Sequence, residues 1–550
     1  MEYSIENSKE IEYYQRKKEK LEKKIANLRK NKLYSYYLEK YNNELKLINK
    51  TIEYFQTLPK KEAKVKKALA KEKKKRYQIL NGNITQAIIM VCFPLAVYGF
   101  FNSFYSLIDS MMSSLIKDAA TGSGAVNISN VAVISQLKSM ISAFGAGIAG
   151  GGGVLVSRFY GSGKLNKARK AASNMVFISI ILSLVLLLVL APSASLILQI
   201  AQVPTINSDV ILYFEFILIE LILVAINNIF ICLEKIKGNS KKILILNILA
   251  LMIKLLMNTI FIFGFHVNKI IFLEIATIIG QAFIFIYGIF VLFGNKNLLK
   301  ISIKEMKPER ELIIKILKLS IPIFLGKFVM SLGKAIVNAL CGLYYAEATE
   351  GLITGALGIS NNLSGLVTST TNVFEEGEST IVSQNIGNKN LKRTIKAFIR
   401  TLIIVAIISL IGFILVRYVF LDSLTSLFNR DGSEKMSQYV KEIFVYDCIS
   451  IPSLGLTSAL LGLLYGYGKT FLSSILNFSR IGIRIISLVV CQSIGLNYQA
   501  AGISMGISNI LIGVLALIFL IIFLVSLYKK GYRDMKVSDK EPVDLGLQFE

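Results

Sequence analysis

The chain has 550 residues, of which 53% are hydrophobic, and it carries a formal net charge of +26 with one histidine and no tryptophan. This composition is too apolar for a soluble enzyme of this length, and the long apolar runs lack the alternation of a membrane barrel. The five cysteines have no metal or disulfide spacing. We therefore expect an all-α integral membrane protein that is not an enzyme. Its basic residues gather in residues 1–80 and in alternate loops, which indicates a membrane surface and no nucleic acid partner.

Residues 1–80 are polar and basic, with apolar side chains three and four residues apart. The phase of this pattern slips near Asn31 to Ser35, which predicts a cytoplasmic helical hairpin or a stuttered coiled-coil helix, and Pro59 ends it. The basic run from Lys60 to Arg76 then predicts a juxtamembrane helix. This helix is either a solvated helix that only fixes the topology, or a segment that binds anionic membrane lipids. In the second case, the hairpin before it could serve self-association.

Twelve membrane helices follow from Ile84 onward. They are expected at residues 84–116, 128–158, 171–195, 207–234, 241–266, 270–294, 311–345, 352–384, 394–420, 437–465, 470–494 and 499–528. Basic loops alternate with basic-poor ones, so we expect a multi-pass protein of the inner (plasma) membrane with both termini in the cytoplasm. No amino-terminal signal sequence precedes the first helix.

An internal repeat divides the membrane part. Residues 156–171 read VSRFYGSGKLNKARKA and residues 382–397 read VSQNIGNKNLKRTIKA, each after the second helix of a half. Two similar halves with an even number of helices predict parallel repeats, which are typical of transporters. The expected units are the extension 1–80, a first lobe 84–297, a linker 298–310, a second lobe 311–528 and a cytoplasmic tail 529–550.

Several short phrases occur in a characteristic order: Pro94, then Asp109 in SLIDSMM, the two repeat loops, Pro322 in LKLSIPIFLGK, and LLYGYGKT at 463–470. In this order they resemble the multidrug and toxic compound extrusion (MATE) family, within the multidrug/oligosaccharidyl-lipid/polysaccharide exporter superfamily. The resemblance implies two six-helix lobes that open alternately to either side, with the substrate in the cleft between them. It also implies coupling through an intramembrane carboxylate, for which Asp109 matches.

The first lobe departs from the family's pattern of sodium ligands. Aligned on the phrase IFIFG, two ligand positions hold Lys254 and Asn258, and Thr277 stands where a hydroxyl ligand is expected. An ammonium therefore replaces a fixed carboxylate, which argues for a proton and against sodium as the coupling ion. Lys254 could pair with Asp109, either as a proton-controlled switch or as a static buried ion pair that locks the packing of the lobe.

Charged side chains gather at mid-membrane depth in the second lobe. They are the helix 8 acids Glu375, Glu376 and Glu378, the helix 7 lysines Lys327 and Lys334, and the helix 11 arginines Arg480 and Arg484. Helical spacing places Glu375 and Glu378 on one face and Glu376 about 100° away. The group is either a polar cavity that binds charged substrate and relays protons or a satisfied ion-pair cluster.

Other positions are secondary. Two carboxylates of the family fall on Met330 and near Leu454 here, while Glu215, Glu220 and Asp447 are expected nearer the outer interface as secondary candidates. The glycines from Gly150 to Gly153 predict close helix packing, since no strand or Gly-Lys-Ser/Thr motif accompanies them to make a phosphate-binding loop. No cofactor or metal site is expected.

These observations favour a secondary active antiporter that exports small organic compounds, such as drugs, toxins or metabolites, in exchange for protons. The alternative is a flippase or exporter of anionic lipid-linked or organic-anion substrates, because Lys327, Lys334, Arg480 and Arg484 are expected at mid-membrane depth in the second lobe. A third class is a membrane scaffold whose transporter body anchors the amino-terminal hairpin.

Overall fold

The computed structural model describes residues 2–29, 35–56, 60–117, 124–201, 203–302, 307–349, 352–428 and 434–529, and these contain helices and no strand. The contacts divide the chain into two compact units. The smaller unit holds residues 1–74 with 294–298, and the larger holds 75–293 with 299–550.

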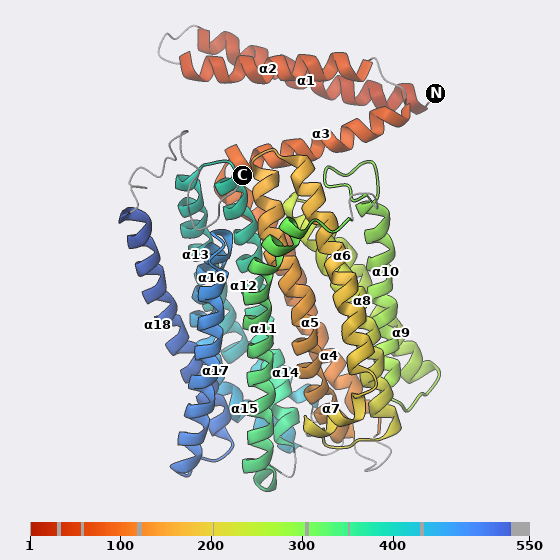
Figure 1. Ribbon diagram of the computed structural model, residues 1–550, viewed down its shortest axis with the longest axis vertical. Coiled ribbons are helices and arrows are strands. Elements are labelled where there is room, and N and C mark those ends of the chain that lie inside the picture. Colours follow the sequence, from red (N-terminus) through yellow and green to blue (C-terminus); the bar gives the residue numbers. More distant parts are fainter. Residues whose placement is uncertain are drawn as a thin grey trace. The chain divides into compact units, whose positions relative to one another are not determined.

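The smaller unit contains a helical hairpin. Helix α1 (Glu2–Arg29) packs against α2 (Ser35–Gln56), as Figure 1 shows, and Leu21, Ile25 and Ile48 are buried. Lys17 of α1 pairs with Glu44 of α2 at 3.2 Å. The predicted hairpin is therefore present; residues 30–34 between the two helices lie outside the described part.

Helix α3 (Lys60–Asn81) carries the basic run and contributes to both units. In the smaller unit, its Glu72 accepts a hydrogen bond from the backbone N–H of Leu298 at 2.8 Å. In the larger unit, Lys75 donates to Asn239 at 2.6 Å and Arg76 to the carbonyl of Gly161 at 3.1 Å. Two cations of the expected lipid-binding segment thus bond to protein, and lipid binding by the others stays a prediction.

In its described part, the larger unit contains the twelve long helices expected from the sequence. They are α4 (Ile84–Leu115), α5 (Gly124–Gly161), α6 (Leu165–Leu190), α8 (Ser208–Ile236), α9 (Ser240–Thr259), α10 (Ile271–Leu292), α11 (Arg310–Tyr345), α12 (Ile353–Gly387), α13 (Leu391–Ile414), α15 (Glu434–Asp447) continued by α16 (Ile451–Gly466), α17 (Thr470–Ser493) and α18 (Gln499–Lys529). Short helices α7 (Ala194–Ile200) and α14 (Leu421–Thr425) join them, and π-helical turns extend α9 over Ile260–Gly264 and α13 over Leu415–Phe420.

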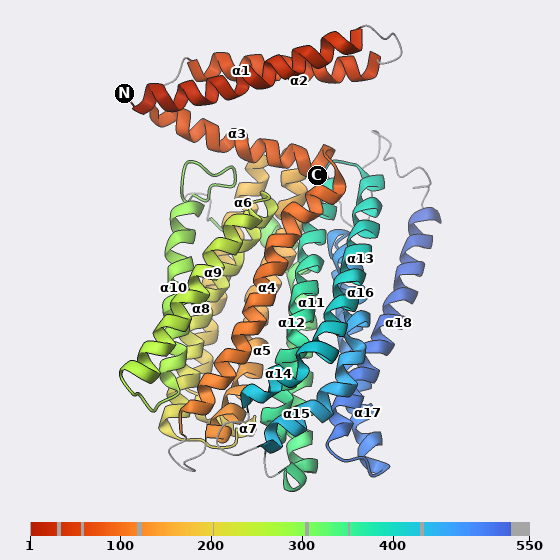
Figure 2. The same cartoon turned by 180° about the vertical axis from the view of Figure 1, so that it is seen from behind.

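Ten of these helices in the described part are long and apolar enough to cross a membrane. The other two are α11 and α12, which carry the predicted intramembrane lysines and glutamates. Both are central: α11 packs against α5 and α17, and α12 packs against α4, α5 and α16 (Figures 1 and 2). Their polar residues are therefore kept inside the bundle, where other protein groups or a cavity can solvate them.

Glycines of α5 let the two lobes approach closely. A Cβ atom at Gly151 would lie 2.4 Å from the backbone nitrogen of Ser320 on α11, and one at Gly147 would lie 2.7 Å from Cβ of Phe324. The close packing predicted for the glycine-rich part of α5 is thus confirmed, and its partner is a helix of the opposite lobe.

Candidate functional site

The largest group of predicted site residues lines a cavity of about 360 Å³ in the second lobe. Helices α11, α12, α16 and α17 supply most of its wall, while α5 of the first lobe adds only Ser139, Ser142, Ala143 and Ala146. Its charged residues are Lys327, Lys334, Glu375, Glu376, Asp447, Arg480 and Arg484. The structure therefore brings together six of the seven residues predicted for a substrate cavity and adds Asp447.

Glu376 connects the two lobes. One of its oxygens lies 2.7 Å from Nζ of Lys235 on α8, and the other lies 3.4 Å from Nζ of Lys327 on α11. The sequence placed Lys235 in a cytoplasmic loop, but α8 continues to Ile236 and buries this lysine. The signal that could have identified it is the position of the first turn residue, because no glycine, proline or asparagine follows Asn228 in α8 before Gly238.

Glu378 does not line the cavity, contrary to prediction. It is fully buried toward α16, where its Oε2 would lie 3.0 Å from a Cβ added at Gly462. Neither carboxylate oxygen has a hydrogen-bond partner within the described part. The reason is the position of each residue around the axis of α12. Viewed along this axis, Glu376 lies about 100° from Glu375 in one direction, and Glu378 lies about 60° from Glu375 in the other. The cavity lies on the side of Glu375 and Glu376, so Glu378 points away from it.

The two arginines of α17 have different partners. Arg484 donates to Oγ of Ser508 at 3.0 Å and to Oδ1 of Asn509 at 2.9 Å. Arg480 donates from Nη1 to the sulfur of Met330 at 3.1 Å, and its buried Nε has no acceptor among the described residues. A thioether is only a weak acceptor, so most of the hydrogen-bonding capacity of Arg480 is unused.

Asp447, a secondary candidate from the sequence, is buried in the cavity wall and accepts a hydrogen bond from Ser364 at 2.5 Å. Glu220 is also buried. Both side chains are buried among packed helices, so the easier solvation expected for them is not found, while their expected location near the outer interface stays a prediction. Glu215 is partly exposed and forms no ion pair with a described residue.

The predicted pair in the first lobe is present. Nζ of Lys254 lies 3.2 Å from Oδ2 of Asp109, and Asn258 donates to the other oxygen at 3.2 Å. Tyr105 completes the group: its hydroxyl accepts from Asn258 at 2.8 Å, and its ring centroid lies 4.6 Å from Nζ of Lys254. Tyr105 was not predicted from the sequence, although its i, i+4 spacing from Asp109 on one helix could have indicated it.

Thr277 is not part of this cluster. Its hydroxyl donates to the carbonyl of Leu273, one turn earlier on α10, at 2.9 Å. A serine or threonine in an apolar helix commonly satisfies its hydroxyl in this way. The expected contribution to an ion site from Thr277 therefore has no support from the geometry.

A second charged cluster in the first lobe was not predicted as a group, and only its Glu220 was a candidate from the sequence. Nζ of Lys138 on α5 lies 2.6 Å from Glu220 on α8 and 3.3 Å from Glu274 on α10. Both carboxylates are buried. The signal was available, since Lys138 and Glu274 each stand alone inside an apolar run, as Asp109 does.

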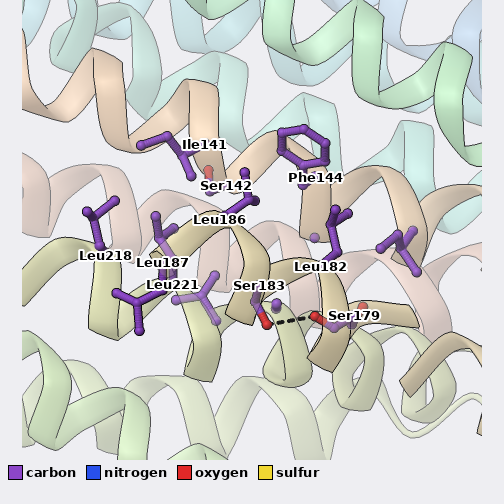
Figure 3. Close-up of a pocket in the computed structure, with 14 residues that line it drawn as sticks. Ile141, Ser142, Phe144, Ser179, Leu182, Ser183, Leu186, Leu187, Leu218 and Leu221 are labelled. Atoms are coloured by element: carbon purple, nitrogen blue, oxygen red, sulfur yellow. Dashed lines mark hydrogen bonds between the residues drawn. The ribbon is translucent and has the colours of Figure 1, made fainter. Parts of the chain in front are cut away.

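Figure 3 shows a different pocket, between α5, α6 and α8. Leucines and other apolar side chains surround it, and its one drawn hydrogen bond joins Ser183 to Ser179 within α6 at 2.6 Å. Its volume of about 20 Å³ is room for about one water molecule. With no charged lining residue and so little space, it is a packing defect within the first lobe and does not compete with the cavity of the second.

The chain matches known proteins over both halves. The model of the MatE family matches residues 94–260 and again residues 322–490. The two matched segments fall one in each lobe, in agreement with the internal repeat.

Individual relatives are distant. The multidrug export protein MepA of Staphylococcus haemolyticus (strain JCSC1435) is 27% identical over 234 residues, which are 41% of this chain and 50% of that protein. This chain thus spans about half the length of that curated relative. A crystal structure of MATE in complex with MaL6 aligns with a TM-score of 0.72 and 16% identity, covering 82% of this chain and 99% of that one.

A MOP superfamily transporter from Pyrococcus furiosus Vc1 (DSM3638), described as having a binding pocket of reverse polarity, aligns with a TM-score of 0.72 at 16% identity, over 82% of this chain and 98% of that one. At such low identity these structures show a shared fold.

Proposed function

Because the chain belongs to the MatE family, that is, to the multidrug and toxic compound extrusion transporters, we propose that it exports small organic compounds in exchange for protons. Transport follows from alternating access, in which the two lobes open the cavity to one side of the membrane at a time. Its relatives named as multidrug export proteins support export as the direction. The observation that supports a proton as the coupling ion is the contact between Asp109 and Lys254.

This contact argues against sodium because a cation already occupies the place beside the carboxylate. With Nζ of Lys254 at 3.2 Å and the amide of Asn258 on the other oxygen, both oxygens of Asp109 have donors. A sodium ion would need several oxygen ligands there and would lie against the ammonium group. A proton needs only one carboxylate oxygen, and its arrival would release Lys254 from the pair.

The contacts between lobes support alternating access. Glu376 of the second lobe is held by Lys235 of the first, and this ion pair must break if the lobes separate there. Because one partner is buried and Glu376 lines the cavity, a bound substrate can compete for the same charges. Occupation of the cavity and separation of the lobes are thereby linked through one carboxylate.

The cavity favours a small compound over a lipid-linked one. Its volume of about 360 Å³ lies within the range of pockets that enclose drug-sized ligands. Its wall is polar and charged along α11, α12 and α17, which does not suit a long hydrocarbon chain.

The test is transport by the purified full-length chain in proteoliposomes, with fluorescein and rhodamine 6G as probes of opposite charge. We expect an imposed pH gradient to drive uptake of at least one dye, and a sodium gradient alone to have no effect. Asp109→Asn should lower gradient-driven flux at least tenfold, because the variant cannot exchange a proton at this position.

Asp422→Asn is the matched control, since Asp422 is largely exposed and pairs with Lys441 at 2.7 Å far along the chain from the cluster. Flux that is the same with and without the pH gradient, and the same in Asp109→Asn, would contradict proton coupling.

A further inference from the structure

We infer that the cavity of the second lobe binds the anionic group of the transported compound, a carboxylate, sulfonate or phosphate, through Arg480 and Lys334. This inference rests on the proposed function only in so far as the bound compound is the transported one. The binding site itself follows from the charges and hydrogen bonds of the cavity wall.

Positive charge exceeds negative charge in this wall. The cations are Lys327, Lys334, Arg480 and Arg484, together with Lys235 in the adjoining pocket, and the carboxylates are Glu375, Glu376 and Asp447. Among the described lining residues, five cations thus face three carboxylates. A buried excess of two positive charges is costly unless a counter-ion enters, so this cavity suits a mono- or dianion.

Arg480 is the residue that most needs an acceptor. It is only 5% exposed, its Nε has no partner in the described part of the chain, and its one described hydrogen bond goes to the sulfur of Met330. A guanidinium offers five N–H donors in a planar fork that fits carboxylate and phosphate oxygens. An anion in the cavity would supply the strong acceptors that the protein does not.

The neighbouring Arg484 is held in place by neutral side chains and brings no carboxylate close to Arg480. Arg484 lies one turn further along α17 and is held by the neutral side chains of Ser508 and Asn509. Its positive charge is therefore not cancelled by a hydrogen-bonded carboxylate. It adds to the field at Arg480 while remaining a fixed part of the wall.

Lys334 of α11 supplies a second free donor on the opposite helix. It lines the same cavity and has no hydrogen bond or ion pair among the described residues. By contrast, Lys327, two turns earlier on α11, already lies 3.4 Å from Glu376. Lys334 and Arg480 together can therefore hold one anion from two sides.

Among the described residues, no carboxylate of the wall forms an ion pair with Arg480 or Lys334. Glu376 is taken by Lys235 and Lys327, and Asp447 accepts from Ser364. Glu375 lines the cavity without a described partner. Asp447 also keeps its negative charge, because a hydrogen bond from a neutral hydroxyl does not compensate it. These two carboxylates lie within a mainly positive wall, so compounds with a donor group beside their anion fit better than polyanions.

The experiment measures equilibrium binding to the purified full-length protein by fluorescence anisotropy. Fluorescein and rhodamine 6G share a xanthene core and differ in charge. We expect fluorescein to bind more tightly, and Arg480→Gln and Lys334→Gln each to weaken its binding about tenfold or more, as for loss of one charge-assisted hydrogen bond. Arg480→Lys should retain part of the affinity. Lys318→Gln is the control, because Lys318 lies on α11 but outside this cavity.

Competition identifies the kind of anion. Benzoate, a water-soluble carboxylate, should displace fluorescein, whereas displacement by phosphatidylglycerol and not by benzoate would assign the site to a lipid headgroup and overturn the inference. Equal fluorescein binding in all variants, or tighter binding of rhodamine 6G, would overturn it as well.

Transport data separate this inference from the proposed function. If rhodamine 6G is transported while fluorescein neither binds nor moves, the anion site is wrong and the exporter stands. If fluorescein binds in an Arg480-dependent manner but neither dye crosses the membrane under any gradient, the anion site stands and the exporter is contradicted.

Discussion

Lys138 holds two buried carboxylates from two other helices of the first lobe. Its contacts to Glu220 at 2.6 Å and to Glu274 at 3.3 Å join α5, α8 and α10. Removing one partner of a buried ion pair typically costs about 3–5 kcal/mol, because the remaining charge is left without compensation. Here two carboxylates would remain, so Lys138 contributes strongly to the stability of this lobe.

We expect Lys138→Met to lower the midpoint of thermal unfolding of the purified protein markedly, as followed by intrinsic tyrosine fluorescence or a dye assay. Lys441→Met is the matched control, because the pair of Lys441 with the exposed Asp422 should contribute no more than about 1 kcal/mol. Adding Glu274→Gln to Lys138→Met should recover part of the loss. A Lys138→Met protein as stable as the control would show that the carboxylates have other compensation.

Some contacts between charged residues could be predicted from the sequence, and others could not. The pairing of Lys254 with Asp109 is predictable because both lie at aligned positions of recognisable phrases. Lys138 and Glu274 stand in apolar runs without such a phrase, so nothing linear indicates that three helices bring them together. The prediction for Glu378 was wrong because helical spacing fixes the angles between residues but not which angle faces the cavity.

Two helices, α5 and α12, meet through equivalent residues of the internal repeat. A Cβ at Gly161 would lie 2.1 Å from the carbonyl oxygen of Gln384, and one at Gly387 would lie 2.2 Å from that of Arg158. In the repeat, Gly161 corresponds to Gly387 and Arg158 to Gln384. The contact therefore has pseudo-twofold symmetry: Gly161 lies against Gln384, and the equivalent Gly387 lies against the equivalent Arg158.

Hydrogen bonds across the lobes follow the same symmetry. Arg158 donates to the carbonyl of Gly466 at the end of α16 at 3.0 Å, and Gln384 donates to that of Ile236 at the end of α8 at 2.8 Å. Gly466 and Ile236 both stand two residues before a glycine of positive φ. This end of the bundle is thus closed by two copies of one contact, which only glycine permits at the crossing.

We expect Gly161→Ala and Gly387→Ala each to loosen this closure, because the added methyl group meets backbone that cannot move without separating the helices. The readout is labelling of Ser331→Cys in the cavity wall by a membrane-impermeant maleimide, which should become several-fold faster from the side of the repeat loops. The five native cysteines are buried and give little background. Gly342→Ala and Gly482→Ala, with open space at the Cβ position, are the controls. Unchanged labelling in both test variants would show that the contact does not limit access.

The helices themselves were largely predictable, and the exceptions have physical causes. The twelve long helices of the described part appear close to the expected limits, because apolar length and loop charge define most of them. The third was expected to reach residue 195, but α6 ends at Leu190 and α7 begins at Ala194. Pro192 explains the break, because it has no backbone N–H to donate to the carbonyl one turn earlier and its ring interferes with a continuing helix.

At the scale of the whole molecule, the two lobes share one arrangement of helices but differ in the charged residues that this arrangement brings together. The described part of the first lobe has compact ion clusters, among them those of Asp109 and Lys138, whereas the second lobe has an open cavity with an excess of positive charge. The repeat predicted two similar halves from the sequence. The repeat could not predict this difference in the arrangement of charges, because the arrangement depends on which side chains of α11, α12 and α17 line the same cavity.

The amino-terminal hairpin has its own packing, which bears on whether the chain acts as a transporter or as a scaffold. Helices α1 and α2 bury Leu21, Ile25 and Ile48 against one another and belong to a unit distinct from the bundle. Among the described contacts, no residue of the charged cavity or of the Asp109 cluster comes from residues 2–56. We therefore expect the hairpin to be dispensable for the proposed transport.

We expect a chain lacking residues 2–56 to insert and to transport dye in proteoliposomes at a rate within about twofold of the full chain, because every ion pair and cavity residue described for transport is retained. The truncated chain should keep α3, since Glu72 accepts a hydrogen bond from Leu298, and Lys75 and Arg76 bond to Asn239 and Gly161. Size-exclusion chromatography with light scattering on the same pair of proteins tests self-association: loss of a dimer on deletion would assign that role to the hairpin. Loss of transport in a stable, inserted truncated protein would show instead that the hairpin takes part in the movement of the lobes.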